Sequence, residues 1–202
     1  MFDRACLPRR LASPALALAL ITTLASAASA HPGHIEGLTG GDFADGIAHP
    51  FSGLDHILTM VAVGLWASQL GRPAFWVLPL AFPAVMAMGA AAGLSAAPLP
   101  WIEIALTGTV VALGAVIALG LRPSLVASAG LIAAFAFLHG FAHGSELPPA
   151  ASALAYGAGF VVATLALHAI GLALGALPRA KVMPRIAGAG IAAAGLVLLV
   201  LV

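Results

Sequence analysis

Apolar runs of the length of a membrane-spanning helix fill the chain from residue 47 onward, and short stretches rich in Pro, Gly or Arg separate them. The runs cover residues 47–70, 74–94, 101–121, 124–143, 151–177 and 182–202. An α-helix needs about 20 predominantly apolar residues to cross a bilayer. The pattern therefore predicts an all-α polytopic membrane protein with six transmembrane helices. Within these runs, Pro50, Pro79 and Pro83 are expected to start or kink helices.

Composition agrees with this pattern. Of the 202 residues, 62% are apolar and 7% are charged, against about 45–50% and about 25% in soluble domains. A soluble globular domain is thereby excluded, and the lipid bilayer is the expected surrounding. The formal net charge is +1 and no long basic run is present, so nothing in the sequence favours binding to nucleic acid.

The first 30 residues have the pattern of an export signal. Arg4, Arg9 and Arg10 precede an apolar core at residues 11–24, and a small-residue A-x-A site follows at residues 28–30. We expect cleavage after Ala30, with Ala27 as the second choice. The alternative is an uncleaved transmembrane helix, for which the apolar core is short.

Cleavage would divide the chain into a signal peptide (1–30), a periplasmic N-terminal segment (31–46) without a domain of its own, and a six-helix transmembrane domain (47–202). The single cysteine, Cys6, would leave with the signal. The mature chain then has neither a disulfide nor a thiolate ligand.

The positions of the basic residues predict the orientation. Arg72 follows the first apolar run, Arg122 follows the third, and residues 179–185 hold three more basic residues before the last. Cytoplasmic loops carry an excess of Lys and Arg. Together with an export signal, this places the mature N-terminus outside the cytoplasm.

Histidines and carboxylates gather toward the opposite, outer side. A charged group at the centre of a membrane helix costs about 2.5–3.5 kcal/mol, so such a cluster implies a function or compensating partners. His139, His143 and Glu146 are spaced to share one helix face, as are His49 and His56. Imidazole suits Ni, Cu, Zn or Fe, and carboxylates disfavour Cu(I). The candidate metal ligands are His31, His34, His49, Asp55, His56, Glu103, His139, His143, Glu146 and His168.

Simpler roles stand beside this interpretation. His168 alone is typical of a hydrogen bond between helices, Glu103 of a carboxylate at a helix start, and Glu146 of a solvated loop. His31 and His34 have the alternative of a solvated tail.

Spacing also predicts how the helices pack. A shared site would require the first and fourth spans to be direct neighbours, with Gly53, Gly140 and Gly144 allowing their backbones to approach. The pairs Gly89/Gly93 and Gly171/Gly175 fit the small-xxx-small packing pattern.

Three segments carry a resemblance to a known family. Residues 49–67 (HPFSGLDHILTMVAVGLWA) are similar to H-P-x-x-G-x-D-H-x-L-x-M-x-x-V-G-x-W-A, and residues 139–146 (HGFAHGSE) to H-G-x-A-H-G-x-E. A weaker match is ATLALH at 163–168. With the signal peptide and six spans, the chain resembles the HupE/UreJ family of bacterial nickel permeases over its whole length. The resemblance implies import of Ni(II), or of Co(II), for urease or hydrogenase maturation.

Two functions of different class remain open from the residues. The favoured one is a permease that takes Ni(II) as transported substrate, with Co(II) as the other candidate ion and with no permanent cofactor. The rival is an intramembrane zinc hydrolase, with His49, His139 or His143 holding Zn(II) and Asp55 or Glu146 acting on its water. A bis-histidine haem protein fits less well, because many carboxylates lie at the same end. No oligomeric state follows from the sequence.

Overall fold

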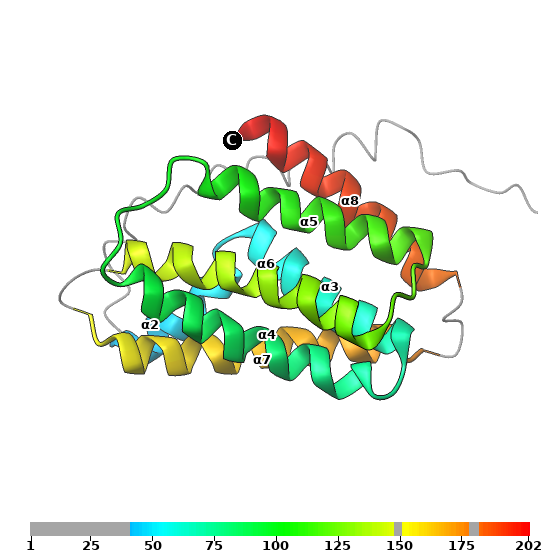
Figure 1. The fold of residues 1–202 in the computed structure, drawn as a ribbon, viewed down its shortest axis with the longest axis horizontal. Helices are drawn as coiled ribbons and strands as arrows, with labels where there is room; N and C mark the ends of the chain where they lie inside the picture. The colour runs from blue at the N-terminus through cyan, green and yellow to red at the C-terminus, as the bar shows by residue number, and fades with distance from the viewer. Residues whose placement is uncertain (1–40, 148–150, 178–181) are drawn as a thin grey trace, which may run out of the picture. The chain divides into compact units, whose positions relative to one another are not determined.

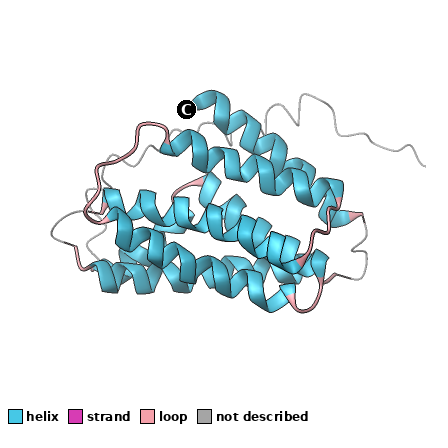
Figure 2. Ribbon diagram, viewed as in Figure 1, coloured by secondary structure: helices cyan, strands magenta, loops and turns pink. Residues whose placement is uncertain are grey.

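The computed structural model describes residues 41–147, 151–177 and 182–202, and within them every regular element is helical (Figures 1 and 2). The predicted signal peptide, His31 and His34 lie outside the described residues. The elements are α2 (Asp42–Ala48), the 3₁₀ turn η1 (His49–Phe51), α3 (Leu54–Leu70), α4 (Ala74–Gly93), α5 (Ile102–Leu119), α6 (Leu125–Glu146), α7 (Ala153–Gly175) and α8 (Met183–Leu201).

In this described part, the helices α4 to α8 are long and apolar enough to cross a membrane, and a sixth span is counted if α2, η1 and α3 form one broken span. Large apolar side chains lie on the outside: Val126 is 81% exposed, and Leu154 and Val200 are 86% exposed. Exposure of this kind fits a surface that faces lipid. The all-α membrane fold is confirmed at this level.

The first span, predicted for residues 47–70, is broken near Pro50, where a helix start or kink was expected. It bends by 80° between Asp42–Phe51 and Leu54–Leu70. Pro50 has no N–H with which to continue an α-helix, Ser52 Oγ donates to the His49 carbonyl at 2.6 Å, and Gly53 is extended, with φ −123° and ψ 134°. A short helix, α2, begins at Asp42, inside the segment 31–46 for which no helix was expected.

Glycines let four helix pairs approach closely. In the pair α4 and α6, a Cβ on Gly89 would overlap the Phe137 carbonyl, and one on Gly140 would overlap the Met86 carbonyl. Gly93 packs in the same way against the Phe141 carbonyl. The contact residues rise together along both helices, so α4 and α6 run parallel.

The helix α7 packs against both parts of the first span and runs parallel to α3. Its Gly159 packs against the Phe43 carbonyl of α2, and its Gly171 against the Val61 carbonyl of α3. In return, Gly64 of α3 packs against the His168 carbonyl. The helices α5 and α8 form an antiparallel pair through Gly114 and Gly188. The predicted packing roles of Gly89/Gly93 and of Gly171/Gly175 are confirmed.

The end of α5 is held by side chains from two other helices. The helix closes at Gly120, whose φ of 67° favours glycine. Trp66 Nε1 donates to the Leu121 carbonyl, and Gln69 Nε2 donates to the Ile117 carbonyl, both at 3.2 Å. Arg185 donates to the Leu119 carbonyl at 3.3 Å. Carbonyls that the helix leaves without an internal donor are thus satisfied by α3 and α8.

Candidate metal-binding site

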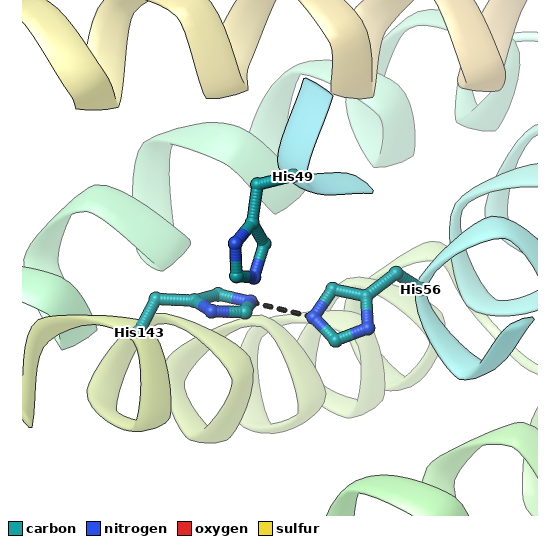
Figure 3. Close-up of side chains that lie close together, drawn as sticks. All are labelled: His49, His56 and His143. Carbon is teal, nitrogen blue, oxygen red and sulfur yellow. Dashed lines mark hydrogen bonds between the residues drawn. The ribbon is translucent and has the colours of Figure 1, made fainter. Parts of the chain in front are cut away.

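Three histidines from separate elements meet where α2 gives way to α3 (Figure 3). His49 comes from η1, His56 from the first turn of α3 and His143 from the last turns of α6. Each offers one ring nitrogen, and these three atoms lie within 4.8 Å of one another. His56 Nε2 and His143 Nε2 are 2.9 Å apart. We call this group the three-histidine site.

The break in the first span makes this site possible. On a continuous helix, His49 and His56 would be separated by about 10.5 Å of axial rise. Because the chain turns at Pro50 and Gly53, the two ring centroids lie 5.4 Å apart. The prediction that His49 and His56 share a face of one helix was therefore wrong, although their side chains do meet.

Side chains rather than backbones connect the first span to α6. His56 reaches His143, as a shared site requires. The glycines expected to bring these helices together have other roles, however. Gly140 and Gly144 pack against the carbonyls of Met86 and Ala90 in α4, and Gly53 lies beside the side chains of its neighbours Asp55 and His56. The first span and α6 are thus linked across the bundle by imidazole rings.

Asp55 orients His56. Its Oδ2 lies 2.8 Å from His56 Nδ1, and the side chains of His56 and Asp55 are 12% and 25% exposed. The contact is an ion pair without hydrogen-bond geometry. Its charge favours a proton on Nδ1 and a lone pair on Nε2, the arrangement found around many metal-bound histidines. Asp55 thus acts on the three-histidine site through His56.

An aromatic wall closes one side of the site. The Phe160 ring lies 4.7 Å from His143, 5.6 Å from His49 and 6.5 Å from His56, measured between ring centroids. Tyr156, one turn earlier on α7, lies 5.8 Å from His49. Sequence reasoning missed both residues. A usable signal existed, because Tyr156, Phe160, Thr164 and His168 recur at intervals of four along one helix face.

An apolar cavity of about 620 Å³ lies next to the wall, between α4, α6 and α7. His143, Tyr156 and Phe160 border it, and most of its other lining side chains are aliphatic or glycine. His143 therefore has an open apolar space beside it.

His139 is fully buried and stands apart from the three-histidine site. Its Nε2 lies 3.0 Å from Thr109 Oγ1. The Thr109 hydroxyl donates to the Leu106 carbonyl at 2.6 Å, so it accepts from His139 Nε2–H. In this tautomer His139 Nδ1 carries a lone pair. The ring centroid of His139 is 5.9 Å from that of His56.

His168 lies deeper still. Its Nδ1–H donates to the Pro79 carbonyl at 3.1 Å. That carbonyl has lost its helical donor, because residue 83, which would supply the N–H, is a proline. The expected alternative role of His168, a hydrogen bond between helices, is thus what the structure displays for Nδ1.

One glutamate lies at the N-terminal end of its helix and the other at the C-terminal end of its helix. Glu103 is in the first turn of α5 and is partly buried, and Glu146 is the last residue of α6 and is exposed. Each makes at least one interaction. Among the described residues, the structure does not group either glutamate with the three histidines.

Fold and site together define a class: a polytopic helical membrane protein with a histidine cluster suited to a divalent transition-metal ion. The chain belongs to the HupE/UreJ family, since the family model described as HupE / UreJ protein matches residues 18–198. It is 43% identical to Protein HupE of Rhizobium leguminosarum bv. viciae over 185 residues, which are 90% of this chain and 97% of that protein. No solved structure matches it.

Proposed function

We propose that this protein is an inner-membrane permease that imports Ni(II), or Co(II), into the bacterial cytoplasm for urease or hydrogenase maturation. The observation that carries the proposal is the three-histidine site, with two Nε2 atoms 2.9 Å apart and a third histidine beside them. Family membership supports a transport role, since the HupE/UreJ family is associated with nickel and cobalt transport.

The three imidazoles are close enough to bind one divalent ion after a small rearrangement. Two nitrogens bound in cis positions of a square-planar or octahedral ion, with bonds of about 2.1 Å, are about 3.0 Å apart. His56 Nε2 and His143 Nε2 are 2.9 Å apart because they are hydrogen-bonded to each other, so both rings have to turn their lone pairs toward an ion. His49 has to approach by less than 2 Å, given the 4.8 Å limit on the present separations and the cis spacing of about 3.0 Å.

Charge and solvent exchange fit the same role. The Asp55 carboxylate offsets part of the charge of a divalent ion and holds His56 in the binding tautomer. Glu103 and Glu146, with His31 and His34 of the N-terminal segment, are proposed to attract the hydrated ion to this end of the bundle. The ion would then exchange water for imidazole at the three-histidine site and would be released on the cytoplasmic side.

The zinc hydrolase is less favoured by the geometry. It needs a carboxylate that acts on a metal-bound water. Of the two carboxylates considered for this role, Glu146 is not grouped with the three histidines in the described structure. Asp55 is paired with His56 Nδ1, on the side of the ring away from His143. Its position suits orientation of a ligand better than proton transfer at an ion bound by Nε2.

Uptake of radioactive Ni(II) into proteoliposomes containing the purified protein tests the proposal. We expect time-dependent accumulation with the wild-type chain and almost none with His143→Ala. Thr107→Val is the matched control, because Thr107 is buried in a helix but donates only to the Glu103 carbonyl of its own helix, at 2.8 Å. Equal accumulation in protein-free and protein-containing vesicles would refute the permease.

A further inference from the structure

Buried polar atoms without a partner continue inward from the three-histidine site. Within the part of the chain that the structure describes, they include His139 Nδ1, Thr59 Oγ1, Thr164 Oγ1 and His168 Nε2. The four residues are at most 1% exposed. A buried polar group without a hydrogen bond costs free energy, so several along one route call for an explanation.

The two threonines differ from others in the same bundle. Thr107 and Thr109 return their hydroxyl protons to carbonyls of their own helix, Glu103 and Leu106, which is the usual arrangement in an apolar helix. Thr59 and Thr164 make no such bond in the described structure. Their hydroxyl groups are therefore available to bind a ligand.

Their positions follow the route from the three-histidine site. Thr59 lies one turn after Asp55 and His56 on α3, and Thr164 lies one turn after Phe160 on α7. Another turn along α7 brings His168, about 12 Å of axial rise beyond Phe160. The parallel helices α3 and α7 meet at Gly64 and the His168 carbonyl, which places Thr59 near the level of the turn from Thr164 to His168.

His168 has a lone pair available for a metal ion. A carbonyl only accepts hydrogen bonds, so the contact with Pro79 fixes the proton on Nδ1 and leaves Nε2 bare. Histidine that donates through one ring nitrogen to a carbonyl and binds through the other is a common metal ligand. The hydrogen bond from His168 therefore has two effects. It replaces the N–H that Pro83 cannot give to the Pro79 carbonyl, and it leaves His168 Nε2 able to bind a metal ion.

Phe82 packs beside a histidine of each level. Its ring is fully buried, with its centroid 6.0 Å from that of His139 and 5.4 Å from that of His168. A side chain that packs beside both His139 and His168 is well placed to control passage of a metal ion from the outer level to the inner one.

We infer that His168 Nε2, with the hydroxyls of Thr59 and Thr164, forms a second, inner binding step for the divalent ion, reached from the three-histidine site past Phe82. The inference rests on the proposed transport function. Fewer and weaker ligands at the inner step than at the outer one would favour onward release, because one imidazole and two hydroxyls bind a divalent ion less tightly than three imidazoles.

The test replaces His168 with asparagine. The Asn Nδ2 atom occupies the place of His168 Nδ1, so His168→Asn keeps a donor for the Pro79 carbonyl while it removes Nε2. In proteoliposomes with Ni(II), we expect uptake to fall about tenfold, the lower end of the loss seen when support of a metal site is removed. Equilibrium titration of the purified protein with Co(II), followed by its visible absorption, should retain the tighter binding event and lose the weaker one.

Threonine variants provide the matched set. Thr59→Val and Thr164→Val should each slow Ni(II) uptake about threefold, as expected for loss of one weak polar contact. Thr107→Val makes the same replacement of a hydroxyl by a methyl group, but at a hydroxyl that is bonded within its own helix. It should leave uptake unchanged. Equal uptake by the wild type and His168→Asn, with both Co(II) binding events intact, would overturn the inner step and leave His168 a purely structural residue.

A second background keeps the test decisive if His168→Asn does not fold. Pro83→Ala restores an N–H for the Pro79 carbonyl and makes the hydrogen bond from residue 168 dispensable. Pro83→Ala/His168→Asn should then transport about tenfold less than Pro83→Ala alone, and equal rates would overturn the inference. Absence of uptake by the wild type would instead refute the proposed function.

Discussion

His56 Nε2 lies 2.9 Å from His143 Nε2, although 87 residues separate the two in the chain. Asp55 occupies the other nitrogen of His56 at 2.8 Å, so the lone pair of His56 Nε2 faces the N–H of His143 Nε2. The hydrogen lies on the line between the two nitrogens, whereas an ion about 2.1 Å from both would lie about 1.5 Å off that line, so both rings must turn before they bind one ion. Binding through both Nε2 atoms requires the His143 proton to move to its Nδ1, which has no partner within the described structure.

His56→Ala should abolish the tighter Ni(II) binding event, whereas Asp55→Asn should weaken that event about 10- to 100-fold, because loss of an orienting carboxylate has effects of that size. Equilibrium dialysis with Ni(II) on the purified variants measures both. Expression should be largely retained, since removal of a charge within the membrane does not hinder insertion. Equal, complete loss in both variants would show that Asp55 is itself a ligand.

Residues that hold one ion should act as a unit. We expect His56→Ala/His143→Ala to bind Ni(II) no more weakly than either single variant, because each single change already removes the pair that binds in cis. His49→Ala should retain partial binding, since His49 is the more distant member of the three-histidine site. Isothermal titration of the four proteins gives the comparison, and additive losses would exclude a common ion.

Hydrophobic run length predicted most of the fold. The five later spans begin and end close to the expected residues, since apolar length and short Pro- or Gly-containing breaks are local signals. A helix start or kink was expected at Pro50, but the 80° bend was not, because the apolar run continues through Pro50 and Gly53. The short helix α2 was missed because it depends on a tertiary contact, Gly46 against the Tyr156 carbonyl of α7, and a helix of that length has little stability of its own.

The site was predicted in part. The motifs drew attention to His49, His56 and His143, which the structure brings together. Helix periodicity alone placed His139 with His143, but the hydroxyl of Thr109 holds His139 in a different contact. Phe160 was missed because an aromatic residue in an apolar run carries no chemical signal by itself. Only its place in the same helix row as His168 sets it apart.

Gly140→Ala should destabilise the folded protein by about 1–3 kcal/mol, the usual cost of forcing extra atoms into a packed interior. A Cβ there would overlap the Met86 carbonyl. Gly130→Ala on the same helix is the control, because a Cβ at Gly130 has nothing within 4 Å and alanine favours a helix by about 0.5–1 kcal/mol. Thermal unfolding in detergent should show opposite shifts. Equal midpoints would contradict the close packing of α4 and α6.

We predict that the mature chain starts at His31, through cleavage of the A-x-A site at residues 28–30. Edman sequencing of protein extracted from membranes should give the sequence HPGH, and intact mass should exclude residues 1–30. A chain that starts at Met1 would contradict the prediction and would keep an additional apolar segment.

The three-histidine site is predicted to face the periplasm. Three basic residues lie at the end of the bundle opposite the last turns of α6. Arg72 follows α3, Arg122 follows α5, and Arg185 is in the first turn of α8. Basic residues favour the cytoplasmic side, so His143 should lie toward the outside. Cys6 is the chain's single cysteine and would leave with the predicted signal peptide, so an introduced cysteine would be the only thiol in the mature chain. Ser95→Cys, at the exposed turn after α4, should react with a membrane-impermeant maleimide on intact spheroplasts, and Arg122→Cys, equally exposed, only after permeabilisation. The reverse pattern would place the three-histidine site on the cytoplasmic side, where it would receive metal for export rather than import.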